Sequence, residues 1–521
     1  MNNLTSGQRK LIYMLGVILL LSISAWLGMP SSGELGTGGK IAIKRQEYQL
    51  GEATLGDVDP ASSTMNLVLL GFRGIASSIL WSEAEHYKMH KNWSQLQQTA
   101  DSITLLQPHF RQVWEYQAWN LGFNVSAECD AVADRYYWVK EGAQYIMKGT
   151  RRSSHYPELQ FETGRFFSQK LGKADEKEQF RDFFIHDPEV VAKQSKEIRD
   201  ELQQMKIKNP GQYVAQNQYR DPAVNPDGID NYLEAKKWYE RANALTDRGL
   251  EQHRMDLPLF QAYPYHCMID YAEAREQDGF YNENDTTEIA AWDAESIRAW
   301  KDAGSDWFNI YGSKVFTAAG TADAITFTLA GTEEDLNKMG AVDGQLVRAV
   351  NPSDNTRSKI FWQDRYRSMT NFNYWMFRTG VEQRQKLVEA RRCFHVGKKA
   401  FRERLAEQEA LATLLRGCQL LQDILNEEGM RDETTGISKI VLNEGGDGFI
   451  EDALKSLLII ERINKGLPKD CPLLELWTEP DLQDKRAELR EKFIRWAGDD
   501  GSTPSLPSTG GTELPELPSI P

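Results

Sequence analysis

The sequence predicts an all-α protein: a degenerate array of paired helices, an α-solenoid, with one transmembrane helix at its N-terminus. Two observations predict this fold. From about Ala61 onward, apolar and aromatic residues recur at intervals of three and four, with breaks at Pro, Gly or Asn, as in successive amphipathic helices. Before that region, a charge-free hydrophobic stretch from Leu11 to Leu27 follows Arg9 and Lys10. As a helix, this stretch just reaches across a hydrocarbon core.

The composition indicates a folded chain without a nucleic-acid surface. The 521 residues are 40% hydrophobic and include 14 Trp, which is more apolar surface than a disordered chain carries. The formal net charge of −15 disfavours contact with polyanions such as nucleic acids. The five cysteines lack the spacing of a metal site or a redox pair, so we expect small buried side chains. They are Cys129, Cys267, Cys393, Cys418 and Cys471.

We interpret residues 1–10 as a short N-terminal tail, 11–29 as a transmembrane signal anchor and 30–60 as a linker with an extended lead-in. Trp26 suits the boundary between hydrocarbon and water. The same segment also fits a cleaved signal peptide, because Ser22-Ile23-Ser24 places small residues where a signal peptidase reads them. Under both interpretations, this segment directs the chain to the export machinery.

The basic residues around this segment predict its orientation. Arg9 and Lys10 lie directly before it, whereas Lys40, Lys44 and Arg45 lie further away on the other side. The positive-inside rule then places the N-terminus in the cytoplasm. We therefore expect a single-pass protein of the cell membrane whose bulk is extracytoplasmic.

The remaining chain divides by its periodicity into helical regions at 61–180 and 231–498, an insertion with an irregular loop at 181–230, and a disordered Pro/Ser/Gly tail at 499–521. Helices are expected at Asn66–His90, Trp93–Leu106, Phe110–Asn124, Ala131–Met147, Tyr156–Leu171, Tyr265–Gln277, Ile289–Tyr311, Trp362–Phe401, Arg404–Asn426, Phe449–Asn464 and Asp481–Ala497. Within the less regular stretch Lys314–Asn351, the segment ITFTLAG also fits a strand.

Several helices carry the spacing of tetratricopeptide (TPR) repeats, in which small residues let two helices approach and an aromatic ring fills the remaining space. The second helix of a TPR repeat has a small, an aromatic and a small residue in that order, and this order occurs twice here. One further span runs from a Trp that fits the first TPR helix to a Pro that fits the end of the repeat. The candidate repeat-packing residues are Ala235, Tyr239 and Ala242; Ala390, Phe394 and Gly397; and Trp81 and Pro108. The sequence shows no strict period, so the array is TPR-like and degenerate.

Three segments, MNLVLLGFRGIASSILWSEAEHYK, LLQPHFRQVWEYQAWNLGFN and CMIDYAEA, resemble membrane-anchored TPR-like proteins of planctomycete-type bacteria whose function is uncharacterised. The likeness covers roughly Ala61 to Arg402. It implies one N-terminal span and a helical ectodomain. Some members carry an iron-responsive-element label, but this chain lacks the clustered cysteines and the basic face that an iron-sulfur RNA switch needs.

Motifs for chemistry are weak. The loop from Asn225 resembles a calcium loop, with oxygen ligands expected from Asn225, Asp227 and Glu234, but Ala223 stands where the first Asp belongs. A turn that caps the next helix is the competing interpretation. We find no string typical of a metalloprotease, a serine hydrolase or a phosphate loop, so no catalytic residue and no cofactor are expected.

The function expected from these observations is a membrane-tethered, non-enzymatic scaffold that binds a protein partner through its TPR-like array. The partners are then the membrane and an unknown protein, not a nucleic acid, and the oligomeric state is open. The alternative is a ligand-binding protein or an enzyme whose site is assembled between helices, with acids such as Glu83, Glu85 and Glu115 contributing.

Overall fold

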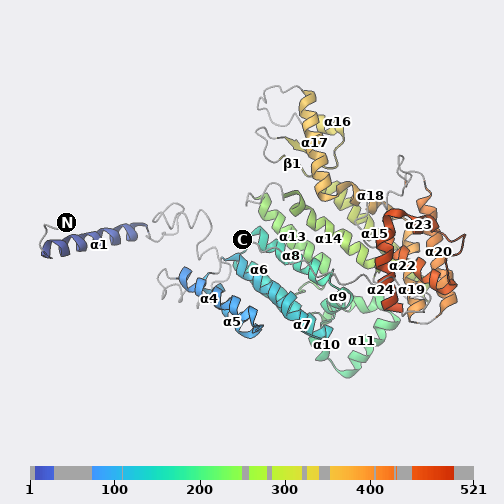
Figure 1. Ribbon diagram of the computed structural model, residues 1–521, viewed down its shortest axis with the longest axis horizontal. Helices are drawn as coiled ribbons and strands as arrows, with labels where there is room; N and C mark the ends of the chain where they lie inside the picture. Colours follow the sequence, from blue (N-terminus) through green and yellow to red (C-terminus); the bar gives the residue numbers. More distant parts are fainter. Residues whose placement is uncertain are drawn as a thin grey trace, which may run out of the picture. The chain divides into compact units, whose positions relative to one another are not determined.

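The computed structural model describes residues 6–27, 73–107, 110–248, 257–277, 284–318, 325–338, 352–403, 406–427, 430 and 449–497. These residues are mostly helical (Figure 1), in agreement with the all-α part of the predicted fold class. The predicted lead-in at 30–60, the candidate packing residue Pro108 and the predicted tail at 499–521 lie outside the described residues.

The predicted transmembrane helix is wrong: among the described residues, no helix combines the length and the apolarity that a membrane span requires. The N-terminal segment does form a helix, α1 (Ser6–Leu27), but its first turns are the polar and basic sequence SGQRK. At about 1.5 Å per residue, the charge-free remainder from Leu11 covers about 25 Å, which is less than the roughly 30 Å of a hydrocarbon core.

The chain forms two compact units, and each consists of two segments. The first unit comprises Met1–Ala274 and Asp302–Met376, and the second comprises Arg275–Lys301 and Phe377–Pro521. The chain passes between the units inside the three helices α14 (Leu257–Gln277), α15 (Thr286–Ser305) and α18 (Phe372–Glu382).

The first unit contains most of the elements. The helices that lie wholly within it after α1 are α4 (Arg73–Met89), α5 (Trp93–Leu106), α6 (Arg111–Trp119), η2 (Asn120–Val125), α7 (Val132–Arg152), α8 (Pro157–Arg165), η3 (Phe166–Leu171), α9 (Lys177–Ile185), α10 (Pro188–Ala192), α11 (Lys196–Lys208), α12 (Pro210–Ala215), η4 (Asn217–Tyr219), α13 (Asn231–Asp247), η5 (Asp306–Tyr311), α16 (Glu333–Lys338) and α17 (Pro352–Thr370). Strands β1 (Phe316–Thr317) and β2 (Thr326–Phe327) pair antiparallel, with Phe316 opposite Phe327. The strand considered for ITFTLAG is thus present as β2.

The helices of the second unit are α19 (Gln385–Arg402), α20 (Glu407–Leu425), α22 (Phe449–Asn464), α23 (Leu474–Thr478), η7 (Pro480–Leu482) and α24 (Gln483–Ala497). Its core gathers aliphatic side chains of α19, α20 and α22. The glycines let these helices approach: a Cβ at Gly397 would lie 2.6 Å from Leu414, and one at Gly417 would lie 2.8 Å from Phe394.

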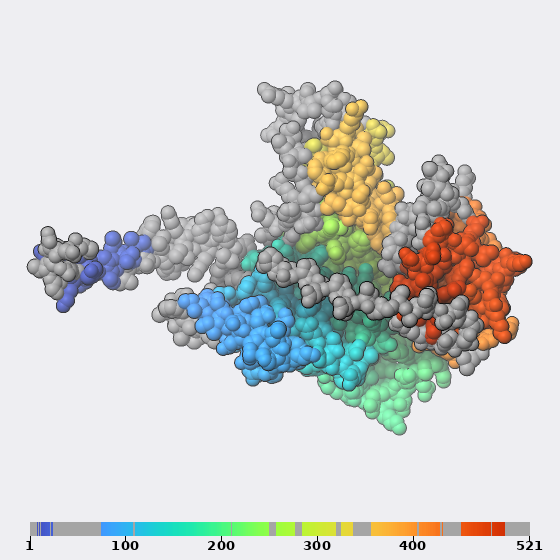
Figure 2. Space-filling view, viewed as in Figure 1, coloured from blue at the N-terminus to red at the C-terminus, as the bar shows by residue number. Residues whose placement is uncertain are grey.

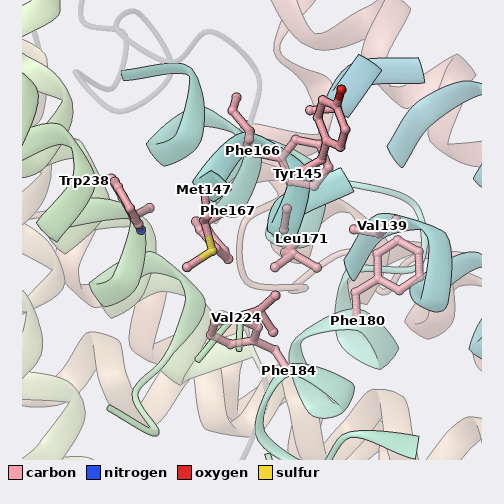
Figure 3. Packing of buried hydrophobic residues seen from close by; sticks show 14 of the residues in the cluster. Val139, Tyr145, Met147, Phe166, Phe167, Leu171, Phe180, Phe184, Val224 and Trp238 are labelled. Carbon is pink, nitrogen blue, oxygen red and sulfur yellow. The ribbon is translucent and has the colours of Figure 1, made fainter. Parts of the chain in front are cut away.

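The core of the first unit is rich in aromatic rings, which pack between α6–η2, α7, α8–η3, α9 and α13. Figure 3 shows Phe166, Phe167, Phe180 and Phe184 pointing into this core. In the space-filling view (Figure 2), α4 to α7, coloured blue to cyan, form one continuous surface. The side chains therefore fill the gaps that the ribbon drawing leaves between these helices.

Three helices end in a π-helical turn: α6 continues into η2, α8 into η3 and α15, which passes from the second unit to the first, into η5. Such turns are uncommon and occur often at functional sites, because the wider turn displaces the side chains that follow it. Gly122 in η2 has no room for a side chain, since a Cβ there would overlap the ring of Phe166 in η3. The first two π-turns therefore lie against each other.

The single helix predicted at Trp362–Phe401 is wrong, because the chain there forms α17, α18 and α19. The first break is at Asn371, whose φ of 50° lies in the left-handed region, which Asn tolerates better than most residues. The second break is at Arg384, whose extended backbone precedes α19. The hydrophobic pattern runs through both breaks, so the pattern alone does not show them.

The predicted insertion at 181–230 contains short helices, including α12 and η4 in the stretch expected to be an irregular loop. Asp187 caps α10 by accepting from the backbone N–H of Glu189 at 2.9 Å. Its other carboxylate oxygen lies 2.9 Å from the Nζ of Lys140 in α7, and Asp221 lies 3.3 Å from the same Nζ. This buried ionic contact attaches the insertion to α7.

Candidate functional site

Most of the predicted packing residues lie in helix contacts. Trp81 on α4 packs against Tyr116, with ring centroids 5.2 Å apart. Ala235, Tyr239 and Ala242 in α13 are fully buried, and Tyr239 faces Gly164 of α8, where a Cβ would lie 3.0 Å from its ring. The second set is also buried, in α19, at contacts with α20: Ala390, Phe394 and Gly397.

The three candidate calcium ligands engage neighbouring groups of the chain. The side-chain oxygen of Asn225 accepts from the backbone N–H of Ile229 at 3.1 Å. Asp227 and Glu234 both contact the Nζ of Lys237. Among the described residues, no group of three or more His, Cys, Asp or Glu side chains is arranged to hold a metal ion.

A hollow in the first unit brings together acidic, basic and aromatic side chains from two helices and their π-turns; we call it the α6–α8 hollow. Its volume is about 30 Å³, enough for roughly two or three water molecules. It is lined by Glu115, Ala118, Trp119, Phe123, Ile146, Glu162, Arg165, Phe166 and Gln169. This is the candidate functional site.

The helical repeat explains why these side chains meet. Arg111, Glu115 and Trp119 are four residues apart on α6 and so lie on one face. Phe123 continues this face in the π-turn η2. Gly142 of α7 permits the close packing behind the hollow, because a Cβ there would lie 2.7 Å from the backbone oxygen of Ala118.

The carboxylates of the hollow are only partly balanced by arginines. The Nε of Arg111 lies 3.1 Å from Glu115, and its Nη1 lies 3.3 Å from Glu158. Arg165 lies 3.0 Å from Glu162. One guanidinium is therefore shared between two carboxylates, which leaves three acidic groups with two basic ones.

The electrostatics of Glu115 follow from this arrangement. Burial is the main cause that raises the pKa of Glu115, to about 7; Arg111 and Arg165 oppose the rise, and Glu162 and Glu158 add to it. Burial also raises the pKa of Glu162, against the two arginines. The site therefore holds a carboxyl group that changes charge near neutral pH, a property common at functional sites.

An exposed aromatic pair forms one wall of the hollow. Trp119 is 45% exposed, and no other tryptophan whose side chain is described is exposed. Its ring stacks on Phe123, with centroids 5.5 Å apart and an interplanar angle of 15°. The Nζ of Lys170 lies 4.7 Å from the Phe123 centroid, so this aromatic pair already holds one cation of the chain itself.

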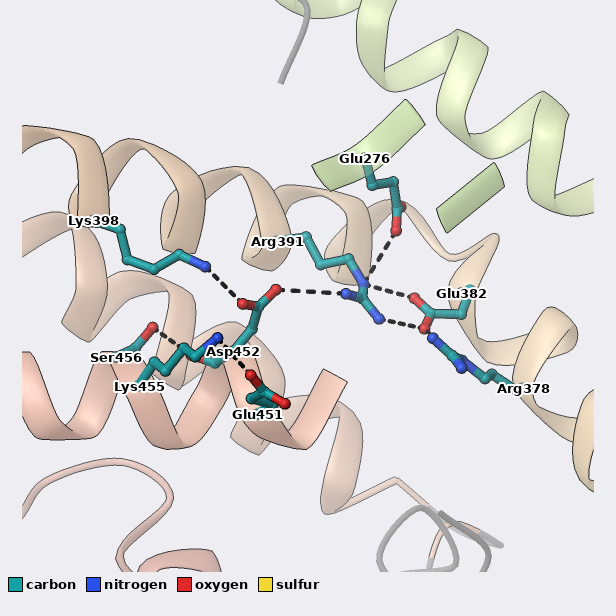
Figure 4. A network of polar contacts seen from close by, with 9 residues as sticks. All are labelled: Glu276, Arg378, Glu382, Arg391, Lys398, Glu451, Asp452, Lys455 and Ser456. Carbon is teal, nitrogen blue, oxygen red and sulfur yellow. Dashed lines mark hydrogen bonds and ion pairs between the residues drawn. The ribbon is translucent and has the colours of Figure 1, made fainter. Parts of the chain in front are cut away.

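The second unit contains a buried ionic network (Figure 4). Arg391 of α19 lies 3.1 Å from Glu276 and donates to Glu382 at 2.8 Å from its Nε. Burial opposes the charge of Arg391, but Glu382 and Glu276 raise its pKa above the ordinary value. Burial would likewise raise the pKa of Asp452, but Lys398 and Arg391 lower it.

This network joins α14, α18, α19 and α22. Figure 4 shows its acids and bases facing one another within the bundle, so it joins helices of the second unit to one another. We therefore assign it a structural role, since the loss of one partner would leave a buried charge unpaired. The α6–α8 hollow differs from it, because its Trp119 reaches the surface.

The chain matches no known protein family, no curated protein and no solved structure. The resemblance to planctomycete-type TPR-like proteins therefore stays a prediction. Of the three acids named from the sequence, Glu115 lies in the hollow and Glu83 is exposed. Glu85 lies near Tyr116, and burial together with the charge of Glu85 raises the pKa of that tyrosine.

The sequence did not indicate four residues of the site: Trp119, Phe123, Glu162 and Arg165. The one available signal was the spacing of Arg111, Glu115, Trp119 and Phe123, which places charged and aromatic side chains on one helix face.

Proposed function

We propose that this chain is a helical scaffold that binds another protein and does not itself catalyse a reaction. The observation that carries the proposal is the exposed, stacked Trp119 at the edge of the α6–α8 hollow. Tryptophan is enriched at the centres of protein interfaces, where it supplies a large apolar surface at a small cost in conformational entropy. Stacks of helical repeats commonly present such residues to partners.

The rest of the hollow suits recognition. Arg165 is exposed beside Glu162, and arginine is a frequent contributor to binding energy. The ring of Trp119 is held in place by Phe123, so its orientation is fixed before a partner arrives. A fixed side chain loses little freedom on binding, which favours affinity.

A catalytic role has one observation in its favour: a carboxyl group with a pKa of about 7 suits general acid–base chemistry at neutral pH. Two features speak against it. The hollow is small, about 30 Å³, and its lining residues include no Ser, Thr, Cys, His or Lys. Binding therefore accounts for more of the geometry than catalysis does.

The test compares the tagged full-length protein with its Trp119→Ala variant by crosslinking in the native cells and mass spectrometry of what co-purifies. We expect at least one protein that crosslinks to α6 or α8 in the unmodified chain and is lost with Trp119→Ala. The matched control is Tyr137→Ala, which removes another exposed aromatic ring of the first unit. If no partner depends on Trp119 more than on Tyr137, the proposal is wrong.

A further inference from the structure

We propose that the α6–α8 hollow receives a basic side chain, an arginine or a lysine, from the partner protein. This inference rests on the proposed function and specifies the chemistry of the partner at one position. It follows from three properties of the hollow: its size, its aromatic wall and its balance of charges.

The size of the hollow suits the head group of a basic side chain. The hollow has a volume of about 30 Å³, which holds roughly two or three water molecules. This volume is comparable to that of an ammonium or a guanidinium group. A larger guest, such as a nucleotide or a peptide backbone turn, exceeds it. The hollow therefore fits the tip of one side chain whose stem approaches across the surface.

The aromatic wall suits a cation. The face of an indole ring attracts ammonium and guanidinium groups more strongly than other aromatic side chains do. Phe123 already holds Lys170 at 4.7 Å, whereas Trp119 is 45% exposed. A guanidinium from outside would stack on Trp119 while its N–H groups point towards the carboxylates of the hollow.

The charge balance favours a cation over an anion. Glu115, Glu158 and Glu162 face only two guanidinium groups, Arg111 and Arg165. Lys170, a further cation beside the hollow, lies over the ring of Phe123 and interacts with Glu176 and Asp175. When Glu115 is ionised, a guest with one positive charge therefore makes the number of bases in the hollow equal to the number of acids, whereas an acidic guest adds a fourth negative charge in a partly desolvated place.

The ionisation of Glu115 should make the binding of the basic side chain depend on pH. The charged groups that face Glu115 are Arg111 from its own helix and Glu158, Glu162 and Arg165 from α8; α7 contributes the apolar Ile146 to the lining. A cation binds more tightly when Glu115 is ionised. Because its pKa is about 7, the affinity for the guest should fall as the pH is lowered from 8 to 6.

The experiment titrates the full-length protein, labelled with 5-fluorotryptophan, with N-acetylarginine amide and, as the neutral isostere, N-acetylcitrulline amide. The fluorine resonance of Trp119 is the one that disappears in Trp119→Phe. We expect arginine amide to shift this resonance at millimolar concentration, with an affinity at least about tenfold above that of citrulline amide, a ratio in the range of cation–π and ionic contacts. At pH 6 the shift should need a higher concentration than at pH 8.

Glu115→Gln should lower the affinity for arginine amide several-fold and remove its dependence on pH. The matched control is Glu178→Gln, which removes a carboxylate from an exposed position on α9. Circular dichroism establishes that both variants keep their helices. Equal shifts with arginine and citrulline amides, or an unchanged affinity in Glu115→Gln, would overturn the inference.

The outcomes separate this inference from the proposed function. A protein partner that depends on Trp119, found together with no preference for arginine over citrulline, leaves the scaffold in place and overturns the basic guest. Binding of arginine amide without any Trp119-dependent partner supports the cation site and overturns the scaffold.

Discussion

Glu115 is half-buried, and both this burial and two neighbouring carboxylates oppose its charge. Its pKa in the folded protein, about 7, lies above the value of an unfolded chain. The folded state therefore binds this proton more tightly, and the ionised form costs stability. That cost is absent below the unfolded pKa near 4.5, grows as the pH rises, and is complete above about 7.

Glu115→Gln should therefore stabilise the first unit at pH 8 by about 1–2 kcal/mol, after allowance for the partial exposure of the side chain, and have no effect at pH 4. The measurement is the free energy of unfolding in urea at the two pH values. Glu178→Gln serves as the control, with little effect expected at either pH. A destabilised Glu115→Gln at pH 8 would show that its contact with Arg111 outweighs the cost of burial.

Gly142 is a second residue whose identity the packing fixes. A methyl group there would lie 2.7 Å from the backbone oxygen of Ala118 and 2.9 Å from the ring of Phe166. Because a backbone atom cannot turn aside, Gly142→Ala should lower the free energy of unfolding by about 1–3 kcal/mol.

Gly380 of α18 is the control for this substitution. No heavy atom lies within 4 Å of a Cβ built there. Gly380→Ala should leave stability unchanged or raise it by up to about 1 kcal/mol, through the helix preference of alanine alone. Thermal unfolding monitored by circular dichroism compares the two variants, and equal effects would contradict the packing argument.

At the scale of elements, the insertion depends on one buried lysine. Asp187 is fully buried and contacts Lys140, which is 5% exposed. Burial opposes the charge of Lys140, but the hydrogen bonds that it donates to Glu189 and Asp187 raise its pKa above the ordinary value. Removal of this cation would leave Asp187 buried without its partner, which typically costs about 3–5 kcal/mol.

Lys140→Met should therefore loosen α10 and the segment around Asp221 more than the rest of the first unit. Hydrogen–deuterium exchange followed by mass spectrometry should show faster exchange there. Lys196→Met, an exposed position on α11, should leave the exchange unchanged. If hydrogen exchange in α10 and around Asp221 were the same in Lys140→Met as in the unmodified protein, other contacts would hold the insertion.

The sequence predicts elements best where local signals agree. The predicted bounds Trp93–Leu106 and Phe449–Asn464 are those of α5 and α22, and Asn92 caps the first of these helices by accepting from the N–H of Gln95. The break at Asn371 depends on a backbone conformation that periodicity does not encode. The hollow was not predictable, because Glu115 and Glu162 are brought together only by the packing of α6, α7 and α8.

At the scale of the whole molecule, neither compact unit is a continuous stretch of chain. Within the first unit, the early segment packs on the late one: the hydroxyl of Tyr311 donates to the backbone oxygen of Pro258 at 2.8 Å. Trp307 also packs against His266, with ring centroids 4.8 Å apart. The two segments of this unit therefore share one core.

A fragment that ends at Ala274 should consequently fail to fold to the native state, although it is long enough for a domain. We expect it to bind the dye ANS and to lack a cooperative thermal transition. A second fragment that ends at Met376 restores Trp307 and Tyr311 and is the control: it should bind less dye. A cooperative transition in the shorter fragment would contradict the shared core.

The π-turns η2 and η3 have a consequence for how this chain tolerates changes in length. A π-turn is equivalent to one residue inserted into an α-helix without a break in the hydrogen-bonded ladder, and each insertion rotates the following residues by about 100°. Deletion of a single residue from η2 would let α6 continue as an ordinary helix and keep its helical content. It would also turn the residues after the deletion away from their present neighbours. For a deletion at Asn120 these residues include Phe123, so Trp119 would lose its stacking partner in a protein that still folds.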